Sequence, residues 1–363
     1  MSITSFSLSS FRNIEAASFS PQCINIIFGE NGSGKTSLLE AIYFLSHGRS
    51  FRTSKHRTVI REGAEKFVLH AKKRSNNLTI PLGLQKNSQG ETLIKIQGKP
   101  SRRISDLAQV LPVQVITPDS YSFFFGGPKE RRSFVDLGVF HVEHEFFVHW
   151  QNFNKVLKQR NALLKSKPRE LHSMLAVWDK EFVRLAEKIT QLRESYIERF
   201  KTLFFDRLCT ELELLNDLEI VFDQGWKSKE SLLEVLKQNR ESDLMRGYTS
   251  KGPHKADLTI KTSLGLVENA FSRGQLKLLL YALKVAQNSL IEQETGKQSI
   301  LLIDDLPSEL SEDTKGKVGK LLAHCESQIF ITTIEPESVS AVLDALDKPK
   351  ALFHVKHGEL ITR

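Results

Sequence analysis

The 363-residue sequence predicts an α/β fold that combines a mainly parallel sheet, an antiparallel β layer and an inserted helical lobe. Three observations support this prediction. Apolar strands alternate with helices near both ends of the chain, short strand-like runs lie between them, and the middle of the chain has a helical period with few glycines. The composition, 40% apolar and 26% charged, is that of a globular protein and excludes collagen-like, low-complexity and fully disordered chains.

The N-terminal region contains strand patterns on both sides of a glycine loop. Residues 23–28 form an apolar run that ends at Gly29, which is typical of a buried strand followed by a loop. Shorter strand-like runs follow at 66–71, 78–84 and 93–96, separated by polar turn residues. We therefore expect an antiparallel β layer beside a first strand–loop–helix unit.

The middle of the chain, residues 129–239, follows a short strand at 113–116 and has mostly helical periodicity. Apolar residues alternate at spacings of three and four in 146–164 and again in 175–203, on either side of Ser166–Pro168. This pattern predicts a short, antiparallel, coiled-coil-like hairpin. Two amphipathic helices packed on the body of the domain are the alternative.

Alternation of strands and helices returns after Ala256. The expected strands are 258–261, 300–303, 328–332 and 351–355, and the expected helices are 274–291, one after Ser311 and one from Glu337. Apolar strands joined by helices imply a parallel sheet covered on both faces. We therefore assign residues 1–122 and 245–363 to one discontinuous lobe and residues 123–244 to an inserted helical arm.

Positive charge is concentrated in one part of the chain. The formal net charge is +8, and residues 41–100 carry twelve Lys and Arg against three Glu. A local excess of this kind suits contact with the phosphate backbone of a nucleic acid, and a solvated face of β strands is the alternative. The candidate DNA-binding residues are Arg49, Arg52, Lys55, Arg57, Lys72, Lys73 and Arg74.

The sequence gives no indication of export or of a membrane anchor. No run approaches the roughly 20 apolar residues of a membrane span, and the first residues do not have a signal-peptide pattern. The three cysteines are far apart and form no metal-binding pair. The sequence therefore predicts a soluble cytoplasmic protein without a disulfide framework.

The residues that carry chemistry begin with a glycine-rich loop that matches G-x-x-x-x-G-K-[ST], follows the apolar strand and opens a helix. Glycines let the backbone N–H groups point inward, and the helix N-terminus adds partial positive charge where phosphates would lie. Lys35 would bridge the β- and γ-phosphates, and the Thr36 hydroxyl would ligate Mg²⁺. The candidate nucleotide-binding residues here are Gly29, Glu30, Asn31, Gly32, Ser33, Gly34, Lys35 and Thr36.

A magnesium–nucleotide site of this kind needs an acidic partner on a neighbouring buried strand. Asp304 and Asp305 directly follow the apolar run 300–303, at the end of the strand where ligands bind in open α/β sheets. We assign Asp304 to Mg²⁺ and Asp305 to polarising the attacking water, which makes them, with Lys35, the candidate catalytic residues. No N-K-x-D sequence is present, which favours ATP over GTP.

A third candidate element precedes the acidic strand. Ser272, Gly274 and Gln275 lie at the start of a predicted helix, where a serine and a glycine can bind an anion through the helix dipole. Because the first loop already satisfies its own nucleotide, we expect this element to reach the γ-phosphate held by another copy of the chain. A simple helix cap is the alternative.

With these residues the chain resembles the ABC-type ATPases of chromosome maintenance, which include the SMC heads, and most closely the bacterial RecF recombination-repair family. The resemblance extends over nearly the whole chain. Besides the loop and the acidic strand, it includes residues 10–13, 38–43, 48–53, 126–128, 131–136, 252–254 and 272–277. The chain departs from the family pattern at Lys255, Ala256 and Ser311.

The resemblance implies an α/β P-loop ABC-type ATPase head that uses ATP and Mg²⁺. It implies an ATP-dependent homodimer that closes head to tail on DNA at gaps or single-strand junctions and works with RecO and RecR to load RecA. Hydrolysis would be slow and stimulated by DNA. A scaffold that binds ATP and DNA without turnover is the alternative, whereas the basic segment argues against a transporter subunit.

Overall fold

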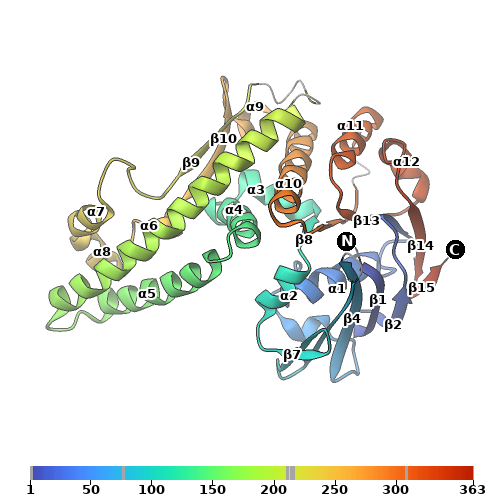
Figure 1. Ribbon diagram of the computed structural model, residues 1–363, viewed down its shortest axis with the longest axis horizontal. Coiled ribbons are helices and arrows are strands. Elements are labelled where there is room, and N and C mark those ends of the chain that lie inside the picture. Colours follow the sequence, from blue (N-terminus) through green and yellow to red (C-terminus); the bar gives the residue numbers. More distant parts are fainter. Residues whose placement is uncertain (1–2, 76–77, 210–211, 213–216, 307–309, 363) are drawn as a thin grey trace. The chain divides into compact units, whose positions relative to one another are not determined.

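The computed structural model describes residues 3–362 except 76–77, 210–211, 213–216 and 307–309. The chain divides into two compact units, residues 1–120 with 277–363 and residues 121–276 (Figure 1). The lobes expected from the sequence differ from these units mainly in residues 245–276. These residues group with the helical arm because β10 (Asp257–Thr262) pairs with β9 (Glu219–Asp223).

The first unit contains the predicted, mainly parallel sheet. Its strand order is β15-β14-β3-β13-β12-β8, and only β15 runs antiparallel to its neighbour. Its strands are β3 (Ile24–Phe28), β8 (Val113–Ile116), β12 (Ile300–Ile303), β13 (Gln328–Thr333), β14 (Lys350–Lys356) and β15 (Glu359–Thr362). The central strands β12 and β13 are buried throughout, as expected for strands covered on both faces.

The antiparallel layer of the first unit has the order β2-β1-β4-β5-β6-β7. Its strands are β1 (Ile3–Phe11), β2 (Ile14–Phe19), β4 (Lys66–Ser75), β5 (Leu78–Asn87), β6 (Thr92–Ile96) and β7 (Lys99–Ser101). Helix α1 (Lys35–His47) packs against strands of both sheets. The rings of Phe11, Phe44 and Phe67 meet edge to face in this core, with centroids 5.0–6.0 Å apart.

Helices complete the first unit. α2 (Ile104–Val110) lies beside α1, and α10 (Arg273–Thr295) runs from the second unit into the first. α11 (Glu312–Ala323) begins after Ser311, whose hydroxyl accepts a hydrogen bond from the Thr314 N–H. In place of the helix expected from Glu337, the structure has a 3₁₀ turn, Pro336–Val339, followed by the single turn α12 (Ser340–Leu343).

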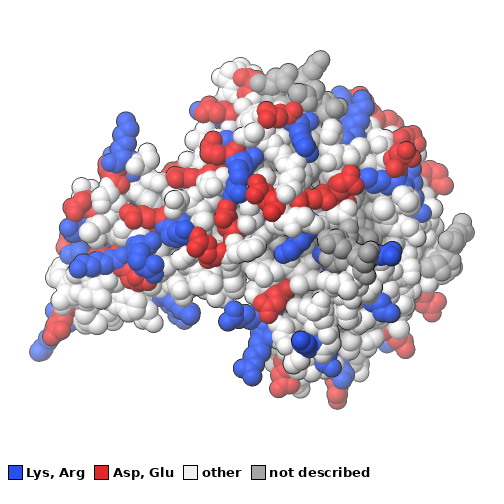
Figure 2. Space-filling view, viewed as in Figure 1, with Lys and Arg blue, Asp and Glu red and all other residues white. Residues whose placement is uncertain are grey.

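The second unit consists mainly of helices. They are α3 (Ser122–Phe125), α4 (Pro128–Val142), α5 (Phe146–Ser166), α6 (Leu171–Leu203), α7 (Leu232–Gln238), α8 (Arg240–Arg246) and α9 (Val267–Ala270). α5 and α6 form the predicted antiparallel hairpin, in which Phe153 meets Phe182 with ring centroids 5.0 Å apart. Acidic and basic side chains are interspersed on the face of this hairpin seen in Figure 2.

A small antiparallel sheet, β11-β10-β9, accompanies these helices, with β11 at Gly265–Leu266. The sequence placed the 258–261 strand in the parallel sheet, and that expectation was wrong. Its buried residues alternate at Leu258 and Ile260, as in a strand with one solvated face, and its partner β9 lies in a region that we expected to be helical. No helix of the described residues is long and apolar enough to cross a membrane.

Candidate functional site

The glycine-rich loop connects β3 to α1 in the first unit. Gly29, Gly32 and Gly34 have φ angles of 148°, 78° and 119°, which L side chains rarely adopt. A Cβ on Gly29 would also lie only 2.2 Å from the Val355 carbonyl oxygen. The first N–H groups of α1 have no partners within the helix, so its N-terminus offers donors to an anion.

Lys35 is folded over this loop. Its Nζ donates to the carbonyl oxygens of Gly29 at 2.6 Å and Glu30 at 2.9 Å. Burial lowers the pKa of Lys35, and the charges of Asp305 and Asp304 oppose that effect. The ammonium group is therefore held at the loop beside two carboxylates, in reach of an anion bound by the loop.

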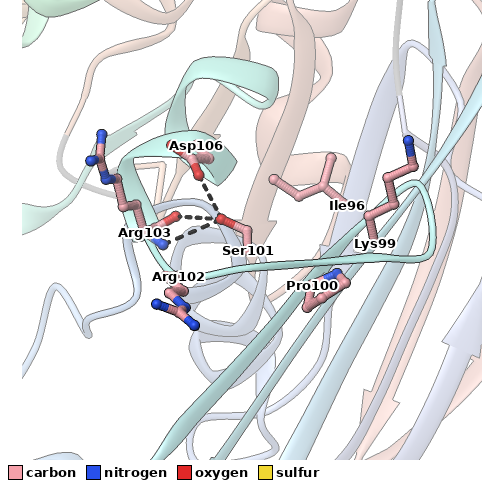
Figure 3. Close-up of a pocket in the computed structure, with 7 residues that line it drawn as sticks. All are labelled: Ile96, Lys99, Pro100, Ser101, Arg102, Arg103 and Asp106. Atoms are coloured by element: carbon pink, nitrogen blue, oxygen red, sulfur yellow. Dashed lines mark hydrogen bonds between the residues drawn. The ribbon is translucent and has the colours of Figure 1, made fainter.

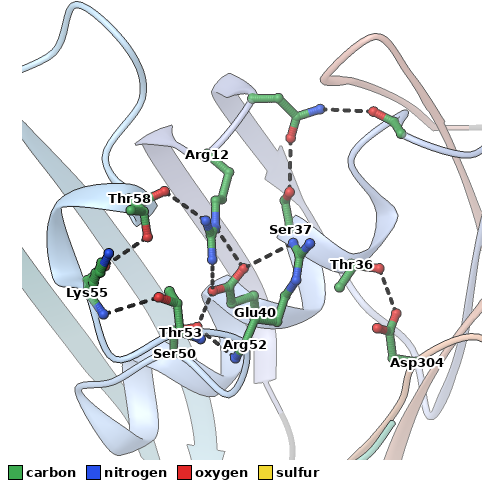
Figure 4. Close-up of polar contacts among 12 residues, drawn as sticks. Arg12, Thr36, Ser37, Glu40, Ser50, Arg52, Thr53, Lys55, Thr58 and Asp304 are labelled. Atoms are coloured by element: carbon green, nitrogen blue, oxygen red, sulfur yellow. Dashed lines mark hydrogen bonds and ion pairs between the residues drawn. The ribbon is translucent and has the colours of Figure 1, made fainter. Parts of the chain in front are cut away.

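The next strands supply the acidic partner. The Thr36 hydroxyl donates to Asp304 Oδ1 at 2.9 Å (Figure 4). The Thr332 hydroxyl donates to the same oxygen at 2.9 Å. Thr332 Oγ1 in turn accepts the Asp305 N–H at 2.7 Å. Burial raises the pKa of Asp304, whereas its bonds to the two threonines lower it. Asp305 is exposed and has a φ of 52°, a strained conformation for a non-glycine residue.

These residues fit a magnesium–triphosphate group. The buried Ser33 hydroxyl has no hydrogen-bond partner among the described residues and lies within the loop that would hold the phosphates. The Thr36 hydroxyl and the Asp304 carboxylate are hard oxygen donors, the kind that Mg²⁺ prefers. In the described part of the chain, no cluster of three His, Cys, Asp or Glu side chains could bind a metal alone, so a cation here would also need phosphate or water oxygens.

The turn between β1 and β2 supports the loop from the other side, although its residues were not among the candidate site residues predicted from the sequence. Asn13 Nδ2 donates to the Ser33 carbonyl at 3.2 Å, and Asn13 Oδ1 accepts from the Ser37 hydroxyl at 2.9 Å. The neighbouring Arg12 forms a bidentate pair with the buried Glu40 of α1. The only signal for this support was that residues 10–13 belong to the family resemblance.

The candidate DNA-binding residues divide by burial. Arg49, Arg52, Lys55, Arg57, Lys72 and Arg74 are exposed. Lys73 is not, because alternate residues of β4 face opposite sides of the sheet. Only 3% of Lys73 is exposed, its Nζ donates to the Val110 carbonyl, and burial lowers its pKa to about 8. We therefore correct the prediction for Lys73, which lies in the interior.

A shallow pocket of about 440 Å³ adds basic residues near the edge of the antiparallel layer (Figure 3). Lys99, Arg102 and Arg103 line it and are exposed, and none of them forms an ion pair with a described residue. Its acidic residue, Asp106, accepts a hydrogen bond from the Ser101 hydroxyl. The basic character found in residues 41–100 therefore continues into this pocket.

The Ser272 element lies in the second unit, at the start of α10. The Ser272 hydroxyl accepts from the Gln275 N–H at 3.3 Å, and Gln275 Oε1 accepts from the Ser272 N–H at 2.7 Å, which is a capping box. Apart from its chain neighbours and its own helix backbone, a Cβ built on Gly274 would meet no atom of the described residues within 4 Å. Ser272 is exposed, so this helix start is capped and open to solvent.

In this site a glycine-rich loop follows a buried strand, and the threonine of the loop is hydrogen-bonded to an aspartate at the end of a nearby parallel strand. These features define the class of P-loop nucleotide-binding proteins. The antiparallel layer and the helical arm narrow that class to ABC-type head domains. The chain matches the model of the RecF/RecN/SMC N-terminal domain over residues 2–360. It belongs to the RecF family of DNA replication and repair proteins.

The relatives support this assignment over the whole chain. The DNA replication and repair protein RecF of Pseudoalteromonas translucida is 65% identical over 100% of both chains. The RecF protein of Shewanella denitrificans is 44% identical over 99% of both. The resemblance found in the sequence is thereby confirmed.

Solved structures agree on the fold. A recombination mediator protein RecF with ATPrS, described in the RecFOR pathway, has a TM-score of 0.87 and 25% identity, covering 99% of this chain and 97% of that one. The Smc head domain of Pyrococcus furiosus has a TM-score of 0.58 and 15% identity, covering 100% of this chain and 96% of that one. The latter supports the ABC-type head fold alone.

Proposed function

We propose that this chain is an ATP- and Mg²⁺-dependent DNA-binding clamp of recombinational repair that acts in the cytoplasm. Two copies would close head to tail on gapped or junction DNA and, with RecO and RecR, help to load RecA. The observation that carries the proposal is the contact of Thr36 and Thr332 with one oxygen of Asp304, because it joins the phosphate loop to the acidic strand end. A similar RecF structure is described with ATP in the RecFOR pathway.

Each site residue has a role in this proposal. When bound, Mg·ATP supplies a γ-phosphate that can be transferred to water. The loop N–H groups and Lys35 bind the phosphates, Thr36 and Asp304 hold the cation, and Asp305 orients a water molecule. Ser272, Gly274 and Gln275 present the positive end of α10 to the nucleotide of the other copy.

The first test is ATP-dependent dimerisation. We expect Lys35→Arg to keep the fold but to lose the dimer formed with Mg·ATP, because a guanidinium cannot occupy the compact position of the ammonium against Gly29 and Glu30. Sedimentation velocity with and without Mg·ATP and gapped duplex measures the effect. Lys227→Arg, at a lysine that is 84% exposed in the second unit, is the matched control. Normal dimerisation of Lys35→Arg would count against the assigned site.

The rate of ATP turnover, measured with and without DNA, distinguishes a slow DNA-stimulated ATPase from a scaffold that binds ATP without hydrolysis. The ATPase requires the exposed Asp305 carboxylate, so Asp305→Asn lowers turnover while ATP binding is retained. A scaffold would show the same low turnover in both proteins.

A further inference from the structure

Glu40 is a charged residue in the interior of the first unit. It lies on α1 one turn after Thr36, and its side chain is 0% exposed. Arg12 donates to both of its carboxylate oxygens, at 2.9 and 2.6 Å, and the Ser50 hydroxyl donates to one of them (Figure 4). A buried carboxylate is tolerated only when it is paired in this way, so these bonds are strong and directional.

The cluster of Glu40, Arg12 and Ser50 is connected on one side to the phosphate loop. Glu40 is on the helix that the loop opens, and its partner Arg12 is adjacent to Asn13, which holds the Ser33 carbonyl and the Ser37 hydroxyl. Arg12 has a φ of 56°, so the turn that carries both side chains is tightly constrained. A shift of the loop or of the first turn of α1 would therefore displace Glu40 and Arg12 together.

The other side leads to the basic segment 49–57. Besides donating to Glu40, Ser50 Oγ accepts the N–H groups of Arg52 at 2.8 Å and Thr53 at 3.0 Å, which fixes the backbone beneath Arg52. The Arg52 guanidinium is only 3.6 Å from Glu40 and its side chain is 48% exposed. Arg12 also contacts the residue that directly follows the segment, because its Nη1 donates to the Thr58 carbonyl at 2.8 Å.

We propose that Glu40, acting through Ser50, is a positioning residue that couples the nucleotide loop to the DNA-contacting segment 49–57. The Glu40 carboxylate is fully engaged by Arg12 and Ser50, so the more distant Arg52 side chain is the member of the cluster that can turn to a DNA phosphate. Meanwhile, the Arg52 N–H remains bonded to Ser50, and Ser50 remains bonded to Glu40 of α1. The inference rests on the proposed function, since it requires that ATP and DNA both bind.

The experiment is a thermodynamic cycle on the full chain. DNA affinity is measured with and without Mg·ATP, at one salt concentration, for the wild type, Ser50→Ala and Ser50→Thr. We expect Mg·ATP to raise the DNA affinity of the wild type about 5-fold or more, within the usual range of coupling between sites. Ser50→Ala should bring this ratio close to one, and Ser50→Thr, which keeps the hydroxyl, should restore it.

Two controls separate coupling from loss of structure. ATP affinity in the absence of DNA and the melting temperature should stay near wild-type values in Ser50→Ala, because the Arg12–Glu40 pair remains. A wild type whose DNA affinity ignores Mg·ATP overturns both the proposed function and this inference. A wild type that responds, together with a Ser50→Ala variant that responds equally, overturns the inference alone.

Discussion

The Asp304 side chain experiences two opposing effects. Burial, the larger effect, raises its pKa, whereas the hydrogen bonds from Thr36 and Thr332 lower it. The folded state therefore binds the Asp304 proton more tightly than the unfolded chain does. The contribution of Asp304 to stability falls as the pH rises through its folded pKa. We expect Asp304→Asn to raise the melting temperature of the ligand-free protein by a few degrees at neutral pH, since the amide oxygen still accepts from Thr36 and Thr332. The further increase caused by Mg·ATP should disappear. Thermal melts with and without Mg·ATP test this, and a normal ligand shift in the variant would contradict the assigned role.

Lys72 and Lys73 are neighbours on β4 that face opposite sides of the sheet. We expect Lys72→Met to weaken DNA binding and to reduce the slope of log affinity against log salt by about one. Lys73→Met should leave both quantities unchanged, because its ammonium group is inside and bonded to the Val110 carbonyl. Binding titrations over a range of salt concentrations compare the pair, and equal losses in the two variants would show that the strand faces are assigned wrongly.

The burial of Lys73 also predicts that the stability of the protein depends on pH. Burial lowers the pKa of Lys73 from 10.5 to about 8, so between these values the unfolded chain holds the proton more tightly than the folded protein. The free energy of unfolding of the wild type should therefore rise with pH across this window, relative to Lys73→Met. Denaturation at both ends of the window, for both proteins, measures the difference.

Site residues could be predicted from the sequence where a motif specifies the backbone conformation. They could not be predicted where a contact depends on the packing of segments that are far apart in the chain. Asp304 follows an apolar strand, so its proximity to Thr36 was predictable. Glu40, in contrast, interrupts an apolar helix, and no pattern in the sequence shows that Arg12 and Ser50 pair with it. Alternation in β4 could have identified Lys73 as an inward residue, because Phe67, Leu69 and Ala71 on the same face are buried.

At the scale of elements, the helical hairpin depends on a buried ionic cluster. Arg160 is 0% exposed and donates to Asp179 at 2.8 Å and to Asp243 at 3.1 Å, which ties α5 to α6 and α8. We expect Arg160→Met to destabilise the arm by about 3–5 kcal/mol, because it leaves buried carboxylates without this partner. The exposed pair of Arg184 with Glu181 is the control, and Arg184→Met should cost less than about 1 kcal/mol.

Tryptophan fluorescence can measure this effect in the intact chain. The three tryptophans, Trp150, Trp178 and Trp226, all lie in the second unit, so their emission during urea denaturation reports the arm selectively. If Arg160→Met lowered the free energy of unfolding of the arm no more than Arg184→Met does, the buried cluster would not stabilise the hairpin.

The elements that were predicted correctly are those whose partners are close in sequence or whose burial is two-sided. The parallel strands were identifiable as apolar runs, and the α5–α6 hairpin from its seams and short connection. The pairing of β10 with β9 could not be predicted, because the alternation of buried and exposed residues in a half-buried strand does not specify which strand it pairs with. The helix expected from Glu337 is short, and Pro336 and the serines at 338 and 340 favour turns there.

For the whole molecule, the proposed clamp requires that each nucleotide be completed by the other copy. In a twofold-symmetric dimer, one subunit would supply the loop with Lys35 and its partner the α10 start with Ser272. Lys35→Arg and Ser272→Arg would therefore each damage both composite sites of a homodimer. A mixed dimer of the two variants would concentrate both defects in one site and leave the other site intact.

We expect neither variant alone to dimerise with Mg·ATP, and an equimolar mixture to recover part of the wild-type dimer in sedimentation. The recovery should depend on Mg·ATP and should disappear when the mixture contains two different loop variants, such as Lys35→Arg with Gly34→Arg, because every composite site then has a damaged loop. If Ser272 acted only as the cap of its own helix, mixing could not help, since each subunit would carry its defect into every dimer. Recovery on mixing therefore distinguishes a site shared between copies from two independent sites, whatever the rate of ATP turnover.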